Sequence, residues 1–542
     1  SWRQGGGAGV PDLEWQARLW RRLRERIAEP DPAERLDTAC AALRSDPALA
    51  PLPPRLSLFG PTRLTEEELA VLTALAEHRD VHLWLPHPSP DLWSRLPRID
   101  EVPPRRADPT AALPRHPLLA SLGRDVRELQ VRLSGRMSRS VHHPLPEPPP
   151  TLLGRLQREL RDDAPPVVPT PIGPDDTSVA VHLCHGPDRQ VEVLREIVLG
   201  LLAEDPTLEP RDIVVLCPDI ERFAPLISAT FGLGDVGHPG HRLQVRLADR
   251  ALRQVNPLLD TVERLLELAQ HRLTASEVLD LLASRPVRTR FGLDDDDLER
   301  LRSLVIAAGV RWGLDAAHRA PYKLDGFPQN TWAAGLDRLL LGVAMPAATR
   351  DWLGTALPLD DVDSSDTERL GALAEFVDRL AGVLSGLTGE RPLQAWIECL
   401  LGALDLLTAT SPTEAWQGAH ARAELADAVV EAGPHAGTVP LGLADVRGLL
   451  AERLRGGPSR ASFRTGSLTV ATLVPMRSVP HRVVCLLGLD DGAFPRTTTV
   501  DGDDLLAREP RVGDRDLRSE DRQLLLDAVC AATERLVVIA SG

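Results

Sequence analysis

The sequence lacks long uncharged apolar runs and a leader-like start. No stretch of 18 uncharged apolar residues occurs in its 542 residues, which leaves no candidate for a transmembrane helix. Ser1 is not followed by a basic and then apolar segment, so we expect no signal peptide here. Because the sequence also opens without methionine, we expect it to be an internal fragment of a longer protein.

Cysteine is scarce and scattered. The six cysteines form no CxxC pair and do not stand at the spacing of Cys/His metal ligands. A disulfide framework and a zinc or iron–sulfur site are therefore not expected, and we predict no metal site. Isolated thiols fit a reducing compartment, so we expect a cytoplasmic protein.

Lysine is almost absent, and positive charge is in the minority. Lys323 is the only lysine among the 62 Lys and Arg residues, and the formal net charge is -16. A chain with this balance does not carry a surface covered by basic patches. Any nucleic-acid site must therefore be local.

What the sequence does contain is an alternation of strand and helix patterns. Thr65 is a predicted N-cap, with Glu68 three residues on, for a helix between two strand patterns. We also expect one helix over 15–43. The strand patterns are 55–60, 81–86, 178–186, 211–219, 466–475, 481–489 and 535–540. This alternation predicts parallel sheets of the α/β class.

Long helical stretches interrupt the second α/β block. They are rich in Leu, Ala and Arg and run from about 250 to 455. Within them, Asp294 to Asp297 are expected to be acidic residues at a helix N-terminus rather than metal ligands. We predict a first α/β domain over 1–101 and a second α/β domain made of two parts, 177–250 and 456–542. A basic helical segment with a Pro-rich linker, 102–176, lies between the two domains in the sequence. A helical insert, 251–455, separates the two parts of the second domain.

The segment from 102 to 161 is the most basic long stretch, with eleven arginines against five acids. One interpretation is a solvated helical face beside a proline-rich connector. The other is phosphate contact, for which Arg124, Arg127 and Arg132 are the candidate DNA-binding residues.

The carboxyl-terminal part carries a resemblance to a known family. The stretch ATLVPMRSVPHRVVCLLGLDDGAFPR (471–496) and the following GDRDLRSEDRQLLLDAVCAATERL resemble RecC, the gamma subunits of RecBCD helicase–nucleases (exodeoxyribonuclease V). The likeness extends to LSLFGPTRLT, LADRALRQVNPLLD and QNTWAAGLDRLLLGVAM, in the same order. The resemblance implies degenerate superfamily 1 helicase-like (P-loop NTPase-like) parallel-sheet domains with a large helical insert.

The resemblance also implies a lost ATPase. A helicase of the UvrD type needs a phosphate-binding loop, an Asp-Glu pair for Mg²⁺ and arginines that stabilise the transition state. The sequence has no GxxxxGK[ST] motif. The matching positions hold Gly60-Pro61, Pro218, Val474, Arg477, Pro480 and Ala531. We therefore predict no catalytic residue and no cofactor in this chain, with ATP and Mg expected on partner subunits.

Charged residues nonetheless survive where the resemblance places the groove between the two motor-like domains. The candidate DNA-binding residues there are Arg477, Arg515, Arg518, Glu520, Asp521 and Arg522. Arginine can contact phosphates or base edges, and a carboxylate can accept from cytosine. The alternative is an internal ion-pair network that holds the cleft shut. We expect Arg522 to be structural and Arg518 to face DNA.

The function implied by the resemblance is a DNA-guiding scaffold. Its partners would be DNA, as duplex ends and single strands, and RecB-like and RecD-like subunits. The complex would split double-strand ends for recombinational repair and scan one strand for a Chi-like signal, while this chain would lack ATPase and nuclease residues. The alternatives are an active UvrD-like ATP-dependent helicase and an AddB-like nuclease subunit.

Overall fold

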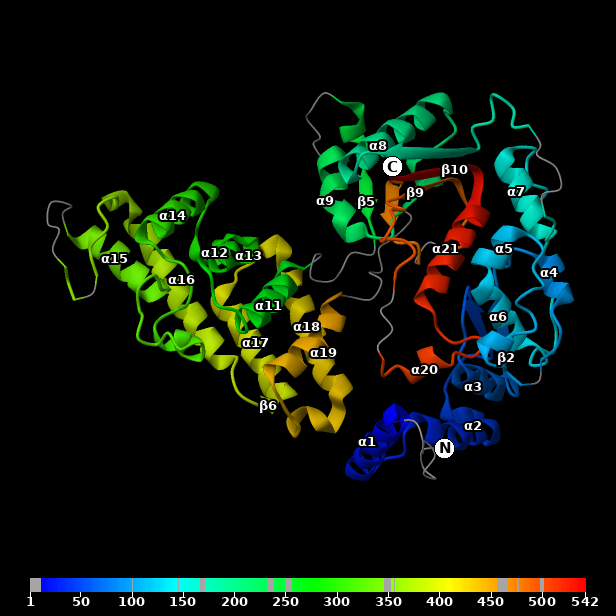
Figure 1. The fold of residues 1–542 in the computed structure, drawn as a ribbon, viewed down its shortest axis with the longest axis horizontal. Helices are drawn as coiled ribbons and strands as arrows, with labels where there is room; N and C mark the ends of the chain where they lie inside the picture. Colours follow the sequence, from blue (N-terminus) through cyan, green and yellow to red (C-terminus); the bar gives the residue numbers. More distant parts are fainter. Residues whose placement is uncertain are drawn as a thin grey trace. The chain divides into compact units, whose positions relative to one another are not determined.

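The computed structural model divides the chain into two compact units. Unit 1 consists of residues 1–249 and 461–542, and unit 2 of residues 250–460 (Figure 1). The described residues are 11–99, 101–144, 146–165, 171–231, 238–248, 256–345, 352–354, 356–455, 466–474, 477–497 and 502–542. The domain boundaries predicted near 250 and 455, and part of the predicted linker, lie in or beside segments outside the described residues.

Unit 1 begins with a small α/β block. Its elements are α1 (Pro11–Ile27), α2 (Pro32–Ser45), β1 (Arg55–Phe59), α3 (Glu66–Ala76) and β2 (Asp80–Trp84). Strands β1 and β2 pair in parallel. Thr65 caps α3 and forms a capping box with Glu68, which confirms the predicted helix start.

The prediction of one continuous helix over 15–43 is wrong. Helix α1 ends at Ile27, and a second helix starts with Asp31 as N-cap and Pro32 in its first turn. Proline has no backbone N–H to donate to the preceding turn, so it is tolerated at a helix start but not inside a continuous helix.

The main sheet of unit 1 has six strands, all parallel. They are β3 (Val179–Cys184), β4 (Ile213–Leu216), β5 (Val245–Leu247), β8 (Leu468–Ala471), β9 (His481–Leu487) and β10 (Ala532–Ser541). The spatial order is β3-β10-β9-β4-β8-β5. Strands β3, β4 and β5 precede unit 2 in the sequence, and β8, β9 and β10 follow it. The predicted mixed α/β class with a parallel sheet is confirmed.

Helices cover both faces of this sheet. Helices α8 (Pro187–Glu204) and α9 (Ile220–Phe231) lie on one face, where Val215 of β4 is buried. Helices α5 (Pro117–Leu122), α7 (Leu152–Arg161) and α21 (Leu517–Ala531) lie on the other face, where the neighbouring Val214 is buried. The alternation of adjacent strand residues between two cores is expected for a sheet buried on both sides.

The basic segment is part of the core of unit 1. Helix α6 (Arg124–Leu133) lies against α21, and seven of its ten residues are buried. Unit 1 also contains α4 (Pro90–Arg95) and α20 (Leu505–Arg508). The segment from 102 to 161 therefore joins the two α/β blocks through packed helices.

Unit 2 is helical, apart from a short antiparallel pair of β6 (Arg391–Pro392) and β7 (Pro440–Leu441). Its helices are α11 (Pro257–Leu268), α12 (Ala275–Ala283), α13 (Arg285–Phe291), α14 (Asp295–Ala308), α15 (Trp332–Ala344), α16 (Thr367–Gly386), α17 (Leu393–Leu407), α18 (Trp416–Ala432) and α19 (Leu443–Arg455). Asp294 caps α14, as its sequence predicts. None of the described helices is both long and apolar enough to cross a membrane.

Candidate nucleic-acid interface

Arg477 links the two α/β blocks of unit 1 at the carboxyl ends of their strands. It follows β8, and its guanidinium donates to the carbonyl oxygen of Gly60 and, over 3.1 Å, to Oγ1 of Thr62. Gly60 directly follows β1 and has φ +67°, a conformation that glycine adopts without strain. The positive charge predicted to contact DNA therefore lies in the turn at Gly60 and is held there by hydrogen bonds within unit 1.

Two largely buried carboxyl groups, Asp125 of α6 and Asp527 of α21, lie in this part of unit 1, and Asp527 is close to Arg477. Asp527 accepts from Gln523 over 2.8 Å, and its Oδ2 is 3.8 Å from Nε of Arg477. Asp125 of α6 accepts from the hydroxyl of Ser519. Burial raises the pKa of both carboxyls to about 6, against the opposing effect of these donors. Of the two, Asp125 joins α6 to α21 through its hydrogen bond with Ser519, and burial disfavours the charged form of both acids.

Glu128 ties α6 to the loop before α21. Its carboxylate accepts two hydrogen bonds of 3.0 Å from Arg105 and one of 2.6 Å from the backbone N–H of Gly513. The Glu128 side chain is only 2% exposed. Because all three of these donors belong to unit 1 and the carboxylate is buried, Glu128 has a structural role.

The three arginines predicted in the basic segment have carboxylate partners. Arg127 pairs with Asp108 over 2.8 Å, and both side chains are buried. Arg124 pairs with Asp516, and Arg132 lies 3.5 Å from Glu66. A solvated face does not describe Arg127, and a phosphate could reach its guanidinium only by displacing Asp108.

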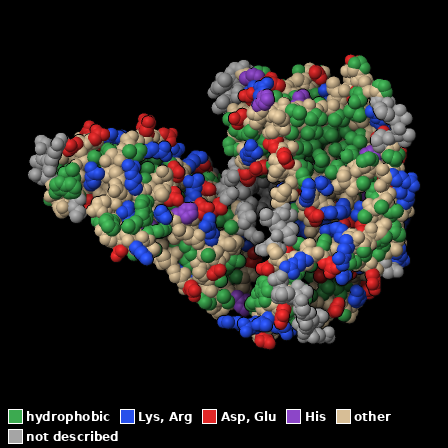
Figure 2. All heavy atoms as spheres, viewed as in Figure 1, with side chains coloured by type: hydrophobic (Ala, Val, Ile, Leu, Met, Phe, Trp, Pro, Cys, Tyr) green, Lys and Arg blue, Asp and Glu red, His purple; other side chains and the backbone are tan. Residues whose placement is uncertain are grey.

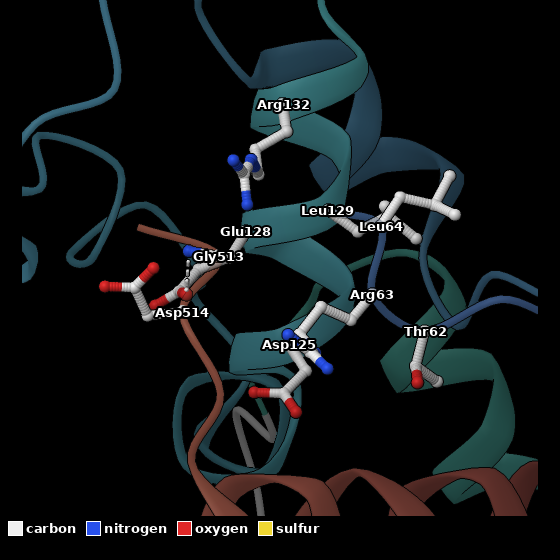
Figure 3. A pocket seen from close by; sticks show the side chains of 9 residues that line it. All are labelled: Thr62, Arg63, Leu64, Asp125, Glu128, Leu129, Arg132, Gly513 and Asp514. Atoms are coloured by element: carbon white, nitrogen blue, oxygen red, sulfur yellow. Dashed lines mark hydrogen bonds between the residues drawn. The ribbon is translucent and has the colours of Figure 1, made fainter. Parts of the chain in front are cut away.

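A small pocket opens between the turn after β1, helix α6 and the loop before α21 (Figure 3). It is lined by Thr62, Arg63, Leu64, Asp125, Glu128, Leu129, Arg132, Gly513 and Asp514. Its volume is about 10 Å³, the room of roughly one water molecule. Ligand pockets usually measure several hundred Å³, so this one has no room for a nucleotide.

The charged start of α21 divides into paired and unpaired residues. Asp521 is 3% exposed and accepts hydrogen bonds from Nε, Nη2 and the backbone N–H of Arg496. Glu520 pairs with Arg515 over 3.0 Å. The exposed Arg518 and the half-buried Arg522 have no side-chain partner among the residues that the structure describes. The buried charge of this segment is thus the carboxylate of Asp521, whose partner Arg496 is half exposed, whereas Arg522 was the residue expected to be structural.

The structure brings the side chains of seven of the nine candidate residues into hydrogen bonds or ion pairs within unit 1. Sequence reasoning missed their partners, above all Arg105, Asp108 and Arg496. Arg105 and Asp108 lie in no motif, and no spacing in the sequence indicates that Arg496, the last residue of the stretch 471–496, pairs with an acid 25 residues further on. On the face seen in Figure 2, acidic and basic side chains are interspersed rather than segregated. Within the described part of the chain, no three potential metal ligands come together.

Comparisons with known proteins place this architecture in a family. A model of the RecC N-terminal domain matches residues 1–163, and a model of the fourth domain of the RecBCD enzyme subunit RecC matches residues 255–458. The chain is 53% identical to the RecBCD enzyme subunit RecC of Mycobacterium tuberculosis (strain CDC 1551 / Oshkosh), over all of this chain and 50% of that protein. It is 32% identical to the protein of the same name from Escherichia coli (strain K12), over 97% of this chain and 51% of that protein. The chain spans about half the length of these curated relatives, and it belongs to the RecC family.

Proposed function

We propose that this chain acts as a non-catalytic, DNA-binding scaffold of a RecBCD-type helicase–nuclease. Its relatives are named subunits of the RecBCD enzyme. In this proposal it assembles in the cytoplasm with RecB-like and RecD-like subunits, guides the strands of double-strand DNA ends and scans one strand for a Chi-like signal. The two α/β blocks of unit 1 would be helicase-like domains without a working ATPase.

The observation that carries the proposal is the position of Arg477. Its guanidinium occupies the turn at Gly60, whose own residues offer a carbonyl and the Thr62 hydroxyl but no carboxylate. A divalent cation with its nucleotide needs carboxylate oxygens there, and a fixed guanidinium would repel the cation. ATP and Mg²⁺ would accordingly be bound by the partner subunits.

Arg518 and Arg522 are the strongest candidates for DNA contact. Both lie on α21, and neither has an acidic partner among the described residues. A phosphate could therefore bind either guanidinium without breaking an existing ion pair. Glu520 and Asp521, which the sequence analysis offered as acceptors for cytosine, already accept from arginines.

The test is DNA binding by the chain, alone and with its RecB-like and RecD-like partners. Fluorescence anisotropy with a forked oligonucleotide should show binding that weakens with salt. The double variant Arg518→Ala/Arg522→Ala should flatten the log-log salt slope by about 0.7 to 0.9 per lost phosphate contact. Arg515→Ala, whose guanidinium already pairs with Glu520, is the matched control and should change the slope less. Absence of DNA binding by the unaltered chain would refute the proposal.

A further inference from the structure

The outer face of strands β1 and β2 carries exposed aromatic rings at its carboxyl end. Phe59 and Trp84 are directly paired across the two strands and are 71% and 45% exposed. His82 stacks on Trp84 with ring centroids 6.0 Å apart and planes 14° apart, and His143 lies 6.2 Å from the same indole. These four residues form what we call the aromatic face.

These rings are not needed for the core beneath the strands. Leu83 of β2 and Leu85, directly after β2, pack against a core cluster that contains Leu69 of α3 and Leu129 of α6. Side chains alternate between the two faces of a strand, and the exposure of β1 alternates in this way. Two adjacent large aromatic side chains left exposed at the end of a sheet indicate a binding surface.

The loop that brings His143 to Trp84 runs from the end of α6 at Leu133 to the start of α7 at Leu152. It contains two arginines, two histidines and one acid, Glu147. Glu147 pairs with Arg158 and Arg136 pairs with Glu66. In that loop Arg139 is exposed and has no side-chain partner in the part of the chain that the structure describes. The one carboxylate on the outer face of the two strands, Asp80, lies opposite Arg55 at their amino ends. That position is about 13 Å from the aromatic pair at the usual rise per residue.

We propose that the aromatic face stacks the unpaired bases of a single-stranded nucleic acid, with Arg139 contacting a phosphate. This inference rests on the DNA-binding function proposed above and names a second place where that DNA is held. Every base offers a π-face, so rings of Phe, Trp and His bind single strands without regard to sequence. Arg139, which has no acidic partner among the described residues, supplies the positive charge that contact with a phosphate requires.

The experiment compares two probes and four proteins. Fluorescein-labelled (dT)20 and an abasic oligonucleotide of the same length are titrated with the unaltered chain and with Trp84→Ala, Trp84→Phe and Trp352→Ala. Trp352 is a matched control, since it is 66% exposed and lies in unit 2. Trp84→Ala should weaken (dT)20 binding about 5- to 150-fold, the factor that corresponds to about 1 to 3 kcal/mol for one stacked base. Trp84→Phe should retain most of the affinity, and Trp352→Ala should retain all of it.

The abasic probe separates stacking from backbone contact. It should bind the unaltered chain more weakly than (dT)20 and should not distinguish Trp84→Ala from the unaltered chain. Equal affinity of all variants for (dT)20 would overturn the inference while leaving the proposed function intact. Loss of partner-subunit assembly in Trp84→Ala with unchanged DNA affinity would also overturn it, because the face would then bind protein. No binding of either probe by any protein would refute both the inference and the proposed function.

Discussion

The substitution Arg127→Met separates a structural arginine from a DNA contact. Arg127 is 4% exposed and Asp108 is 1% exposed, and their side chains are 2.8 Å apart. Removing one partner of a buried ion pair costs about 3 to 5 kcal/mol, because the other charge stays buried without compensation. Asp108 also accepts from the backbone N–H and the hydroxyl of Thr110, at 2.8 and 2.6 Å. Because these two hydrogen bonds still stabilise the Asp108 carboxylate in the variant, we expect a loss of unfolding free energy near the lower limit, about 3 kcal/mol.

A second substitution tests whether the uncompensated charge causes the loss. Both Thr110 bonds reach Oδ1 of Asp108, whereas Arg127 binds Oδ2. Asp108→Asn keeps an acceptor at Oδ1 and removes the charge. The double variant Arg127→Met/Asp108→Asn should therefore recover most of the stability lost in Arg127→Met.

The assay is urea unfolding followed by circular dichroism. Because two units can unfold separately, hydrogen exchange over 124–133 must assign the transition to unit 1. Arg106→Met is the matched control: Arg106 and Glu509 form a 2.7 Å pair, but they are 78% and 62% exposed, so its loss should cost at most about 1 kcal/mol. A cost for Arg127→Met as small as that of the control, together with weaker DNA binding and a flatter salt slope, would refute the structural role.

Two further predictions concern the interface of α6 with α21 and the loop before it. Burial raises the folded-state pKa of Asp527 to about 6 from 3.8, so the stability that this group contributes is present below pH 4 and is lost as pH rises through 6. Asp527→Asn should accordingly match the unaltered chain near pH 4 and be more stable by about 1 to 3 kcal/mol at pH 7.5, as thermal melts at both pH values would show; equal stability at both would contradict the burial of this carboxyl. Gly513→Ala should destabilise unit 1 by more than about 1 kcal/mol, because φ there is +89° and a Cβ would lie 2.4 Å from Cδ of Arg132. Gly173→Ala is the control: no atom lies within 4 Å of an added Cβ there, so the melting temperature should stay unchanged. Equal effects of the two substitutions would contradict the close packing of Gly513 against Arg132.

The parts of the fold that the sequence predicted are those set by local patterns. The capping box of Thr65 and Glu68 involves residues three apart, and the apolar runs that became β4 and β9 are buried in the parallel sheet, as such runs are expected to be. The break between α1 and α2 was also visible in the sequence at Pro32, and the prediction of one helix gave it too little weight.

The role of α6 was not predictable in the same way. RDVRELQVRL resembles a solvated charged helix, yet Arg127 and Glu128 are buried. Their burial depends on Asp108, 19 residues away, and on Gly513, 385 residues away. A contact over that distance leaves no periodic signal in a single sequence, so the choice between an ion-pair network and a DNA contact needed the structure.

The sequence did identify the turn at Gly60 as a site without carboxylates. It did not reveal that Arg477, 417 residues away, donates to the carbonyl of that glycine. The resemblance predicted which charge survives, and the fold determined where its hydrogen bonds go.

The central claim, a DNA-binding chain without an ATPase of its own, is tested most directly by isothermal titration with Mg-ATP. The same preparation is titrated with forked DNA to show that the protein is active in binding. The account predicts heat of binding with the DNA and none with Mg-ATP up to millimolar concentration, since Arg477 occupies the turn at Gly60 and the turn's own residues carry no carboxylate. Micromolar Mg-ATP binding, together with DNA-stimulated release of phosphate by the isolated chain, would contradict it.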